Sequence, residues 1–158
     1  MAYDRAWIYT AATAAEQTAY ANTRRLKTVG STVYLSFPMR LVAKNGVHIQ
    51  PNIREEIKAS RDDNTRDLIR VTAAGTKTQI TMDILGGLNN AEKKEALAWF
   101  TNHETDALKR NINLLYYDPD SDTYKTGSFY RANPEFTAIY TTDTDIIWDA
   151  FTIELVQN

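Results

Sequence analysis

Apolar and polar positions follow two different periods along this chain, and the change between them marks a helix. The pair Gly86–Gly87 interrupts an alternating segment, and Asn89 follows it as a suitable N-cap. Glu92 stands three residues later, where the acidic partner of a capping box belongs. Alternation resumes over residues 112–117. We therefore predict one amphipathic helix near residues 89–110, followed by a strand.

The apolar face of this helix indicates how it packs. Leu97, Phe100 and Leu108 recur at roughly helical spacing. The other side of the helix carries the charged residues Lys93, Lys94, Glu95, Glu104 and Lys109. We predict that the face of Leu97, Phe100 and Leu108 packs on β-structure formed by the rest of the chain.

Short segments of β-branched and aromatic residues, bounded by Gly, Pro, Asn and Asp, account for most of the remaining chain. The predicted strands are 32–37, 39–43, 47–49, 53–59, 68–72, 77–85, 112–117, 123–131, 136–140 and 146–156. This series with one helix favours a mainly β protein of the α+β class. Its expected architecture is a β-sandwich or barrel flanked by the helix.

Three irregular points are expected between or within these strands. Asn45–Gly46 predicts a two-residue hairpin turn, because both positions of such a turn need a positive φ. Residues 61–67 are rich in charge and predict a polar loop. The last strand changes its parity, and a bulge near Asp149 or Ala150 would restore the alternation.

The N-terminal segment differs from the rest in composition. Residues 3–27 are rich in Ala and contain no Gly or Pro, which predicts a helix over about residues 12–26. Its apolar content is mostly Ala and Tyr, too little to anchor a core. We therefore predict a helical arm over residues 1–30 and a single β-rich domain over residues 31–158. Deleting residues 1–28 is expected to leave that domain folded.

An arm of this kind needs a surface on which to dock, because an isolated helix of this length is only marginally stable in water. A neighbouring subunit is the expected surface. The candidate assembly contacts are Trp7, Ile8, Tyr20, Arg24 and Arg25. The two arginines would meet acidic groups, and the apolar side chains would bury contact area.

The length of 158 residues fits one domain, and a net charge of −2 gives no general case for binding nucleic acid or membrane. The charge is unevenly distributed. Residues 1–88 hold 12 basic and 8 acidic side chains, whereas residues 89–158 hold 6 and 12. This asymmetry suits head-to-tail stacking of copies, although chance and acidic turns explain it equally well.

The chain has no cysteine, which excludes disulfides, thiolate metal sites and thiol catalysis and fits a reducing cytoplasm. We find neither a signal peptide nor an apolar run of the roughly 18 residues that a membrane span requires. Asp118, Asp120 and Asp122 have the spacing of a calcium loop. Thr123 and Phe129 stand where such a loop needs Gly and Glu, so turn chemistry is the better interpretation.

Neither histidine has the partners of a zinc site or a catalytic triad. His48 and His103 lack a ligand at helical spacing, and no Gly-x-Ser-x-Gly motif is present. Gly86–Gly87 lacks the pattern of a phosphate-binding loop. We therefore expect no enzymatic activity, cofactor, required metal or small-molecule substrate. Aromatic residues crowd the last third of the chain, so a carbohydrate-binding module is a remote alternative.

Several motifs in one order resemble a known group of proteins. They are Asn-Gly at 45–46, Ile-Gln-Pro at 49–51, Asp-Asp-Asn-Thr-Arg at 62–66, Ile-Thr-Met at 80–82, Leu-Asn-Asn-Ala-Glu at 88–92, Leu-Leu-Tyr-Tyr-Asp-Pro at 114–119, Gly-Ser-Phe-Tyr at 127–130 and Phe-Thr-Ile-Glu-Leu at 151–155. Over roughly residues 39–156 the chain resembles small structural proteins of tailed bacteriophages and prophages from the tail and baseplate region.

Strands flanking one helix also resemble the phage tail-tube fold. The resemblance implies a virion protein assembled in the bacterial cytoplasm, whose partners are copies of itself in a ring and neighbouring tail or baseplate proteins. DNA would at most pass through the lumen, which an acidic lining would ease because like charges repel. A tail-completion or head–tail adaptor protein is the alternative in the same particle.

Overall fold

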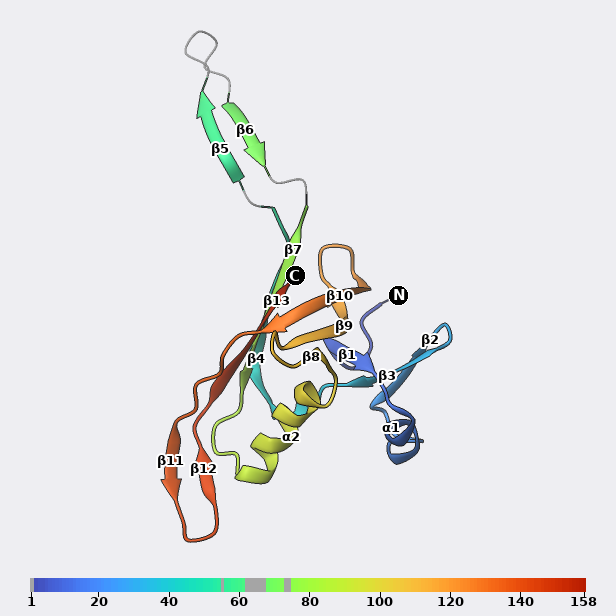
Figure 1. The fold of residues 1–158 in the computed structure, drawn as a ribbon, viewed down its shortest axis with the longest axis vertical. Coiled ribbons are helices and arrows are strands. Elements are labelled where there is room, and N and C mark those ends of the chain that lie inside the picture. Colours follow the sequence, from blue (N-terminus) through green and yellow to red (C-terminus); the bar gives the residue numbers. More distant parts are fainter. Residues whose placement is uncertain (1, 55, 62–67, 73–74) are drawn as a thin grey trace.

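Most of the chain forms one antiparallel sheet in the computed structural model, which describes residues 2–54, 56–61, 68–72 and 75–158 (Figure 1). Hydrogen-bonded neighbours run in the order β2-β3-β1-β9-β10-β13-β7-β4, and β8 pairs with β9 beside this path. The strands are β1 (Ile8–Ala11), β2 (Leu26–Val29), β3 (Thr32–Ser36), β4 (Val42–Ile53), β7 (Lys77–Ile84), β8 (Glu104–Asp106), β9 (Asn111–Asp118), β10 (Thr123–Arg131) and β13 (Phe151–Gln157). The prediction of a mainly β protein is confirmed.

Two hairpins stand apart from this sheet. β5 (Glu56–Arg61) pairs with β6 (Leu68–Thr72), and β11 (Ala138–Thr141) pairs with β12 (Ile146–Trp148). Figure 1 shows them projecting from opposite ends of the molecule. The helical elements are α1 (Ala14–Ala19), the short 3-10 turn η1 (Met39–Leu41) and α2 (Asn90–Thr101).

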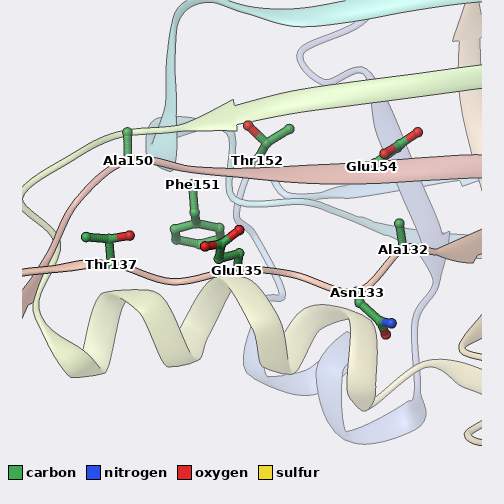
Figure 2. Close-up of a pocket in the computed structure, with 8 residues that line it drawn as sticks. All are labelled: Ala132, Asn133, Glu135, Thr137, Ala150, Phe151, Thr152 and Glu154. Atoms are coloured by element: carbon green, nitrogen blue, oxygen red, sulfur yellow. The ribbon is translucent and has the colours of Figure 1, made fainter.

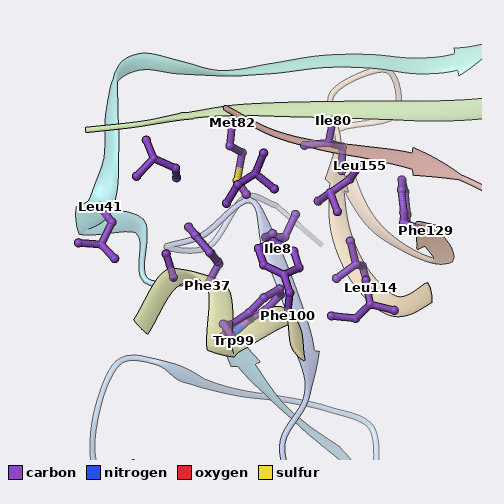
Figure 3. Packing of buried hydrophobic residues seen from close by; sticks show 14 of the residues in the cluster. Ile8, Phe37, Leu41, Ile80, Met82, Trp99, Phe100, Leu114, Phe129 and Leu155 are labelled. Atoms are coloured by element: carbon purple, nitrogen blue, oxygen red, sulfur yellow. The ribbon is translucent and has the colours of Figure 1, made fainter. Parts of the chain in front are cut away.

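The main core lies between α2 and the strands β7 and β13 (Figure 3). Phe37 and Phe100 are fully buried there, with ring centroids 5.6 Å apart, and Trp99 meets both rings edge-on at 5.4 and 4.9 Å. Met82 on β7 and Ile153 on β13 are also buried in this core. The rings of Trp99 and Phe100 on α2 pack on Phe37, which follows β3, and this packing holds the helix against the sheet.

The start of α2, the burial of Phe100 and the partial burial of Leu97 agree with the sequence prediction, but the end of the helix and the place of Leu108 do not. Asn89 accepts a hydrogen bond from the Glu92 amide at 2.9 Å, and the reciprocal bond completes a capping box. The helix ends at Thr101, and Leu108 is 98% exposed. Asp106 accepts hydrogen bonds from the amides of Leu108 and Lys109, which fixes a turn there instead of further helix. The buried face is therefore Ala96, Trp99 and Phe100.

The prediction of a helical arm is wrong for the N-terminal segment. β1 lies inside the sheet, between β3 and β9, and Ile8 and Tyr9 are both fully buried. Helix is limited to the six residues of α1, which a Thr13–Glu16 capping box starts. The many alanines favour helix, but of the predicted helix over residues 12–26 only Ala14–Ala19 is α-helical, and Ile8 and Tyr9 of the predicted arm are buried in the sheet. One sheet contains strands from both parts of the predicted division between residues 1–30 and 31–158.

Asn45–Gly46 is not a hairpin turn. Both residues lie inside β4, where the pairing with β7 shifts register between Val42 and Val47. Asn45 does adopt a positive φ of 58°, and a Cβ on Gly46 would lie 2.7 Å from the carbonyl oxygens of Ala43 and Asp83. The pair therefore forms an irregular point in β4, at which the backbones of β4 and β7 approach each other closely.

The other strand predictions hold in different degrees. Strands β6 and β10 have the predicted bounds, and residues 39–43 form η1 and the start of β4. Asp149 and Ala150 separate β12 from β13, where a bulge was expected inside one strand. The predicted strand 53–59 includes residue 55, and the predicted polar loop includes residues 62–67; these lie outside the described residues.

Candidate functional site

A surface cavity of about 500 Å³ lies between β13 and the segment that leaves β10 (Figure 2). Figure 2 shows Phe151 and Glu135 on the two segments that line the cavity. Glu154 accepts a hydrogen bond from Gln79 Nε2 at 2.6 Å, so this carboxylate already has a protein partner. Neither His nor Lys is among the lining residues Ala132, Asn133, Glu135, Thr137, Ala150, Phe151, Thr152 and Glu154. The cavity thus offers the carboxylates of Glu135 and Glu154 and the hydroxyls of Thr137 and Thr152.

The Asp118–Asp122 segment is a hydrogen-bonded turn. Asp118 is fully buried and accepts hydrogen bonds from the Asp120 amide at 3.0 Å and the Ser121 hydroxyl at 3.2 Å. Lys125 Nζ lies 2.7 Å from the Asp118 carboxylate. Burial raises the pKa of Asp118, but these bonds and one from Asn52 stabilise the charged form, so the pKa lies below its ordinary value. Its oxygens therefore hold the turn between β9 and β10.

Both histidines contact other protein groups. His103 Nδ1 lies 2.6 Å from the carbonyl oxygen of Trp99, and its Nε2 lies 2.6 Å from Glu16 Oε1, which ties the end of α2 to α1. His48 Nε2 lies 3.3 Å from Asp83 Oδ2 across the β4–β7 pair. In the part of the chain that the structure describes, no group of three or more His, Asp or Glu is arranged to hold a metal ion.

The five predicted assembly residues fall into different environments. Ile8 is a fully buried core residue, so its assignment as a contact with another subunit is wrong. Trp7 packs edge-on against Tyr117, with ring centroids 5.4 Å apart. The Arg25 guanidinium lies 4.7 Å from the ring centroid of Tyr20, and Arg24 beside it is exposed. The structure thus brings Tyr20, Arg24 and Arg25 together and leaves Trp7 in a separate aromatic cluster.

Sequence reasoning missed a buried cation beneath the N-terminal segment. Lys27 is 7% exposed, and its Nζ lies 3.9 Å from the ring centroid of Tyr124 and 3.5 Å from Asp4 Oδ2. The Tyr124 hydroxyl donates to the carbonyl oxygen of Ala6 at 2.6 Å. Burial raises the pKa of Tyr9 beside it. These contacts join residues that are far apart in the sequence, so no local motif could have indicated them.

Comparison with known protein families assigns the chain to one of them. One family model matches residues 26–158. The chain belongs to DUF6711, a family of unknown function. The DUF6711 match runs from β2 to the end of β13, and it leaves β1 and α1 outside although β1 lies inside the sheet. No curated protein and no solved structure matches the chain.

The main sheet of this DUF6711 protein has an edge strand on each side. Strands β2 and β4 are terminal in the sheet order, so among the described residues each is paired on one side. On β4, a register shift and Pro51 flank the regularly paired residues Val47 to Gln50. β2 likewise offers four residues, Leu26 to Val29. Edges of this kind can accept a further strand from another chain. No described helix is long and apolar enough to cross a membrane.

Proposed function

We propose that this protein is a structural component of a phage tail or baseplate, or of a related injection particle, and that it acts by assembling into rings. The resemblance of its motifs to tail and baseplate proteins supports this class. A tail-tube-like arrangement is part of the proposal: an open antiparallel sheet with a helix on one face would continue from subunit to subunit around a channel.

The observation that carries the proposal is the β5–β6 hairpin. Its two strands pair with each other and form a separate two-stranded sheet beyond β4 and β7 (Figure 1). An isolated two-stranded hairpin is at best marginally stable in water. A hairpin held away from its own core is therefore well suited to pack on a neighbouring subunit, which would supply the missing apolar surface.

The open edges of the sheet support the same assembly. The regular part of the β4 edge and the β2 edge are of equal length, four residues each. Joining the β2 edge of one copy to the β4 edge of the next is a heterologous contact, which closes into a ring when the rotation per subunit divides a full turn. The irregular remainder of β4 would restrict pairing to one register.

The test uses the whole chain and a variant in which a short Gly-Ser turn replaces residues 56–72. Light scattering after size exclusion and negative-stain microscopy should show rings for the wild type. The variant should melt like the wild type, because the main sheet lacks these residues, but it should stay monomeric. Mass spectrometry of tail particles from the source strain should detect the protein in multiple copies. A wild-type chain that stays monomeric and is missing from such particles would contradict the proposal.

A further inference from the structure

Four arginines surround one surface cavity of about 340 Å³ on the side of the molecule that carries α1 and β2. We call Arg5, Arg24, Arg25 and Arg40 the arginine pocket. Arg5 lies in the segment before β1, Arg24 and Arg25 join α1 to β2, and Arg40 belongs to η1. Phe37, Pro38 and Met39 also line the cavity; Phe37 and Pro38 are buried, and Met39 is the one of the three that is partly exposed.

The charge of the arginine pocket is only partly balanced within the chain. Arg5 forms an ion pair with Asp4 at 2.9 Å, and Arg40 forms one with Glu95. Arg25 donates to the carbonyl oxygen of Ser36 at 2.7 Å, which fixes its position without neutralising it. Arg24 is exposed. Two of the four positive charges therefore remain available for an anionic partner, on groups that favour carboxylates and phosphates.

An acidic projection lies on the other side of the same molecule. Residues 132–158 contain Glu135, Asp143, Asp145, Asp149 and Glu154 and have no Lys, Arg or His. We call β11, β12 and the turn that joins them the acidic hairpin, because Asp143 and Asp145 lie in that turn. Asp143 is exposed, and Ile139 and Tyr140 on β11 are 53% and 57% exposed.

Contacts with α2 hold both β12 and the turn of the acidic hairpin. Trp148 Nε1 donates to Asn90 Oδ1 at 2.7 Å, and the Asn90 amide donates to Asp145 Oδ1 at 3.2 Å. Lys93 Nζ lies 4.0 Å from the Trp148 ring centroid. All of these contacts involve β12 or the turn, whereas every residue of β11 is exposed. The hairpin thus presents an apolar strand and an acidic turn in a fixed orientation.

We propose that the arginine pocket of one copy receives the acidic hairpin of the next copy in the ring, an inference that rests on the proposed function. Figure 1 shows α1 and β2 on one side of the molecule and β11 and β12 on the other, so the two surfaces meet between chains and not within one. Opposite charges favour this contact, and Ile139 and Tyr140 would lie against Met39, the partly exposed apolar residue of the pocket. The contact is heterologous, as a ring requires.

Charge reversal with mixing tests this contact. Arg24→Glu places like charges at the interface, and so does Asp143→Arg, so each variant alone should assemble only at about tenfold or higher concentration than the wild type. An equimolar mixture should recover assembly, because a contact between the two different variants pairs opposite charges. Lys109→Glu makes the same change of charge at another exposed position and should assemble normally. Circular dichroism checks that each variant is folded.

Cross-linking gives a second measurement that does not depend on complete rings. The chain has no cysteine, so Arg24→Cys and Asp143→Cys introduce the only two thiols. Oxidation of the mixed variants should give a covalent dimer, and oxidation of the double variant should give a ladder of oligomers. This inference would be overturned if the wild type forms rings, the charge variants assemble normally and oxidation gives no cross-linked product. The proposed function would then still stand.

Phosphate is the other anion that arginines bind well, so nucleic acid binding is measured in the same series. Fluorescence anisotropy with a short DNA duplex should show no loss of binding in Arg24→Glu compared with Lys109→Glu. If Arg24→Glu loses DNA binding and Asp143→Arg assembles like the wild type, the pocket serves nucleic acid and the contact between copies is refuted.

Discussion

Replacing Phe100 by Ala tests which face of α2 holds the core. The Phe100 side chain is fully buried, and its ring packs on Phe37 at 5.6 Å and on Trp99 at 4.9 Å between centroids. Truncating a buried Phe to Ala costs about 3–5 kcal/mol of stability, because transfer energy is lost and a cavity remains. Aromatic pairs add roughly 0.5–1.5 kcal/mol each, so two lost pairs place Phe100→Ala near the upper end of that range.

Leu108→Ala is the matched control, since the sequence pattern places Leu108 on the same face. Its side chain is 98% exposed, and truncating it should change stability by no more than about 0.5 kcal/mol. Leu97 is partly buried against the core, so Leu97→Ala should fall between the two.

Urea unfolding followed by circular dichroism measures all three variants, and thermal melting checks the order. At about 2–4 °C per kcal/mol for a chain of this size, Phe100→Ala should lower Tm by roughly 8–20 °C. A loss below about 1 kcal/mol for Phe100→Ala, or a loss above that for Leu108→Ala, would refute the packing described for α2.

Two further predictions concern the β9–β10 turn and the N-terminal strand. Asp118→Asn should lower Tm at pH 7, and the difference in Tm from wild type should shrink below about pH 4. The pKa of Asp118 is lower in the folded than in the unfolded protein. The carboxylate therefore stabilises the fold above its unfolded pKa, and this stabilisation is lost as pH falls towards its folded pKa. Equal differences at pH 7 and pH 3 would contradict this. Deleting residues 1–12 should abolish cooperative melting, because β1 pairs with both β3 and β9; a truncated chain that keeps its melting transition would show that β1 is dispensable.

Local sequence signals predicted much of the main sheet because they act over a few residues. The capping box at Asn89 and Glu92 fixed the start of α2, and the alternation of Ile80, Met82 and Ile84 gave β7 to within one residue of its end. Alternation depends on burial of one strand face and therefore survives without knowledge of the partner strand.

Features that depend on distant partners could not be obtained in this way. Ile8 and Tyr9 read as part of the Ala-rich N-terminal arm until the pairing of Ile8 with Tyr116 and of Tyr9 with Ser36 and Leu115 is known. Asn45 has the positive φ that its type favours, but whether that angle serves a turn or an irregular strand depends on β7. The arginine pocket joins three separate segments, and of its members only Arg24 and Arg25 were candidates from sequence.

The position of β1 has a consequence for synthesis of the protein. Tyr9 is made early but pairs with Leu115, so the strand has no partner on that side until about 100 more residues have been added. At about 5–20 residues per second, that interval lasts roughly 5–20 s. During this time the nascent chain carries Ile8 and Tyr9 in a strand with an uncovered side. Chaperone capture of ribosome-bound chains should therefore peak before β9 emerges and fall once it has.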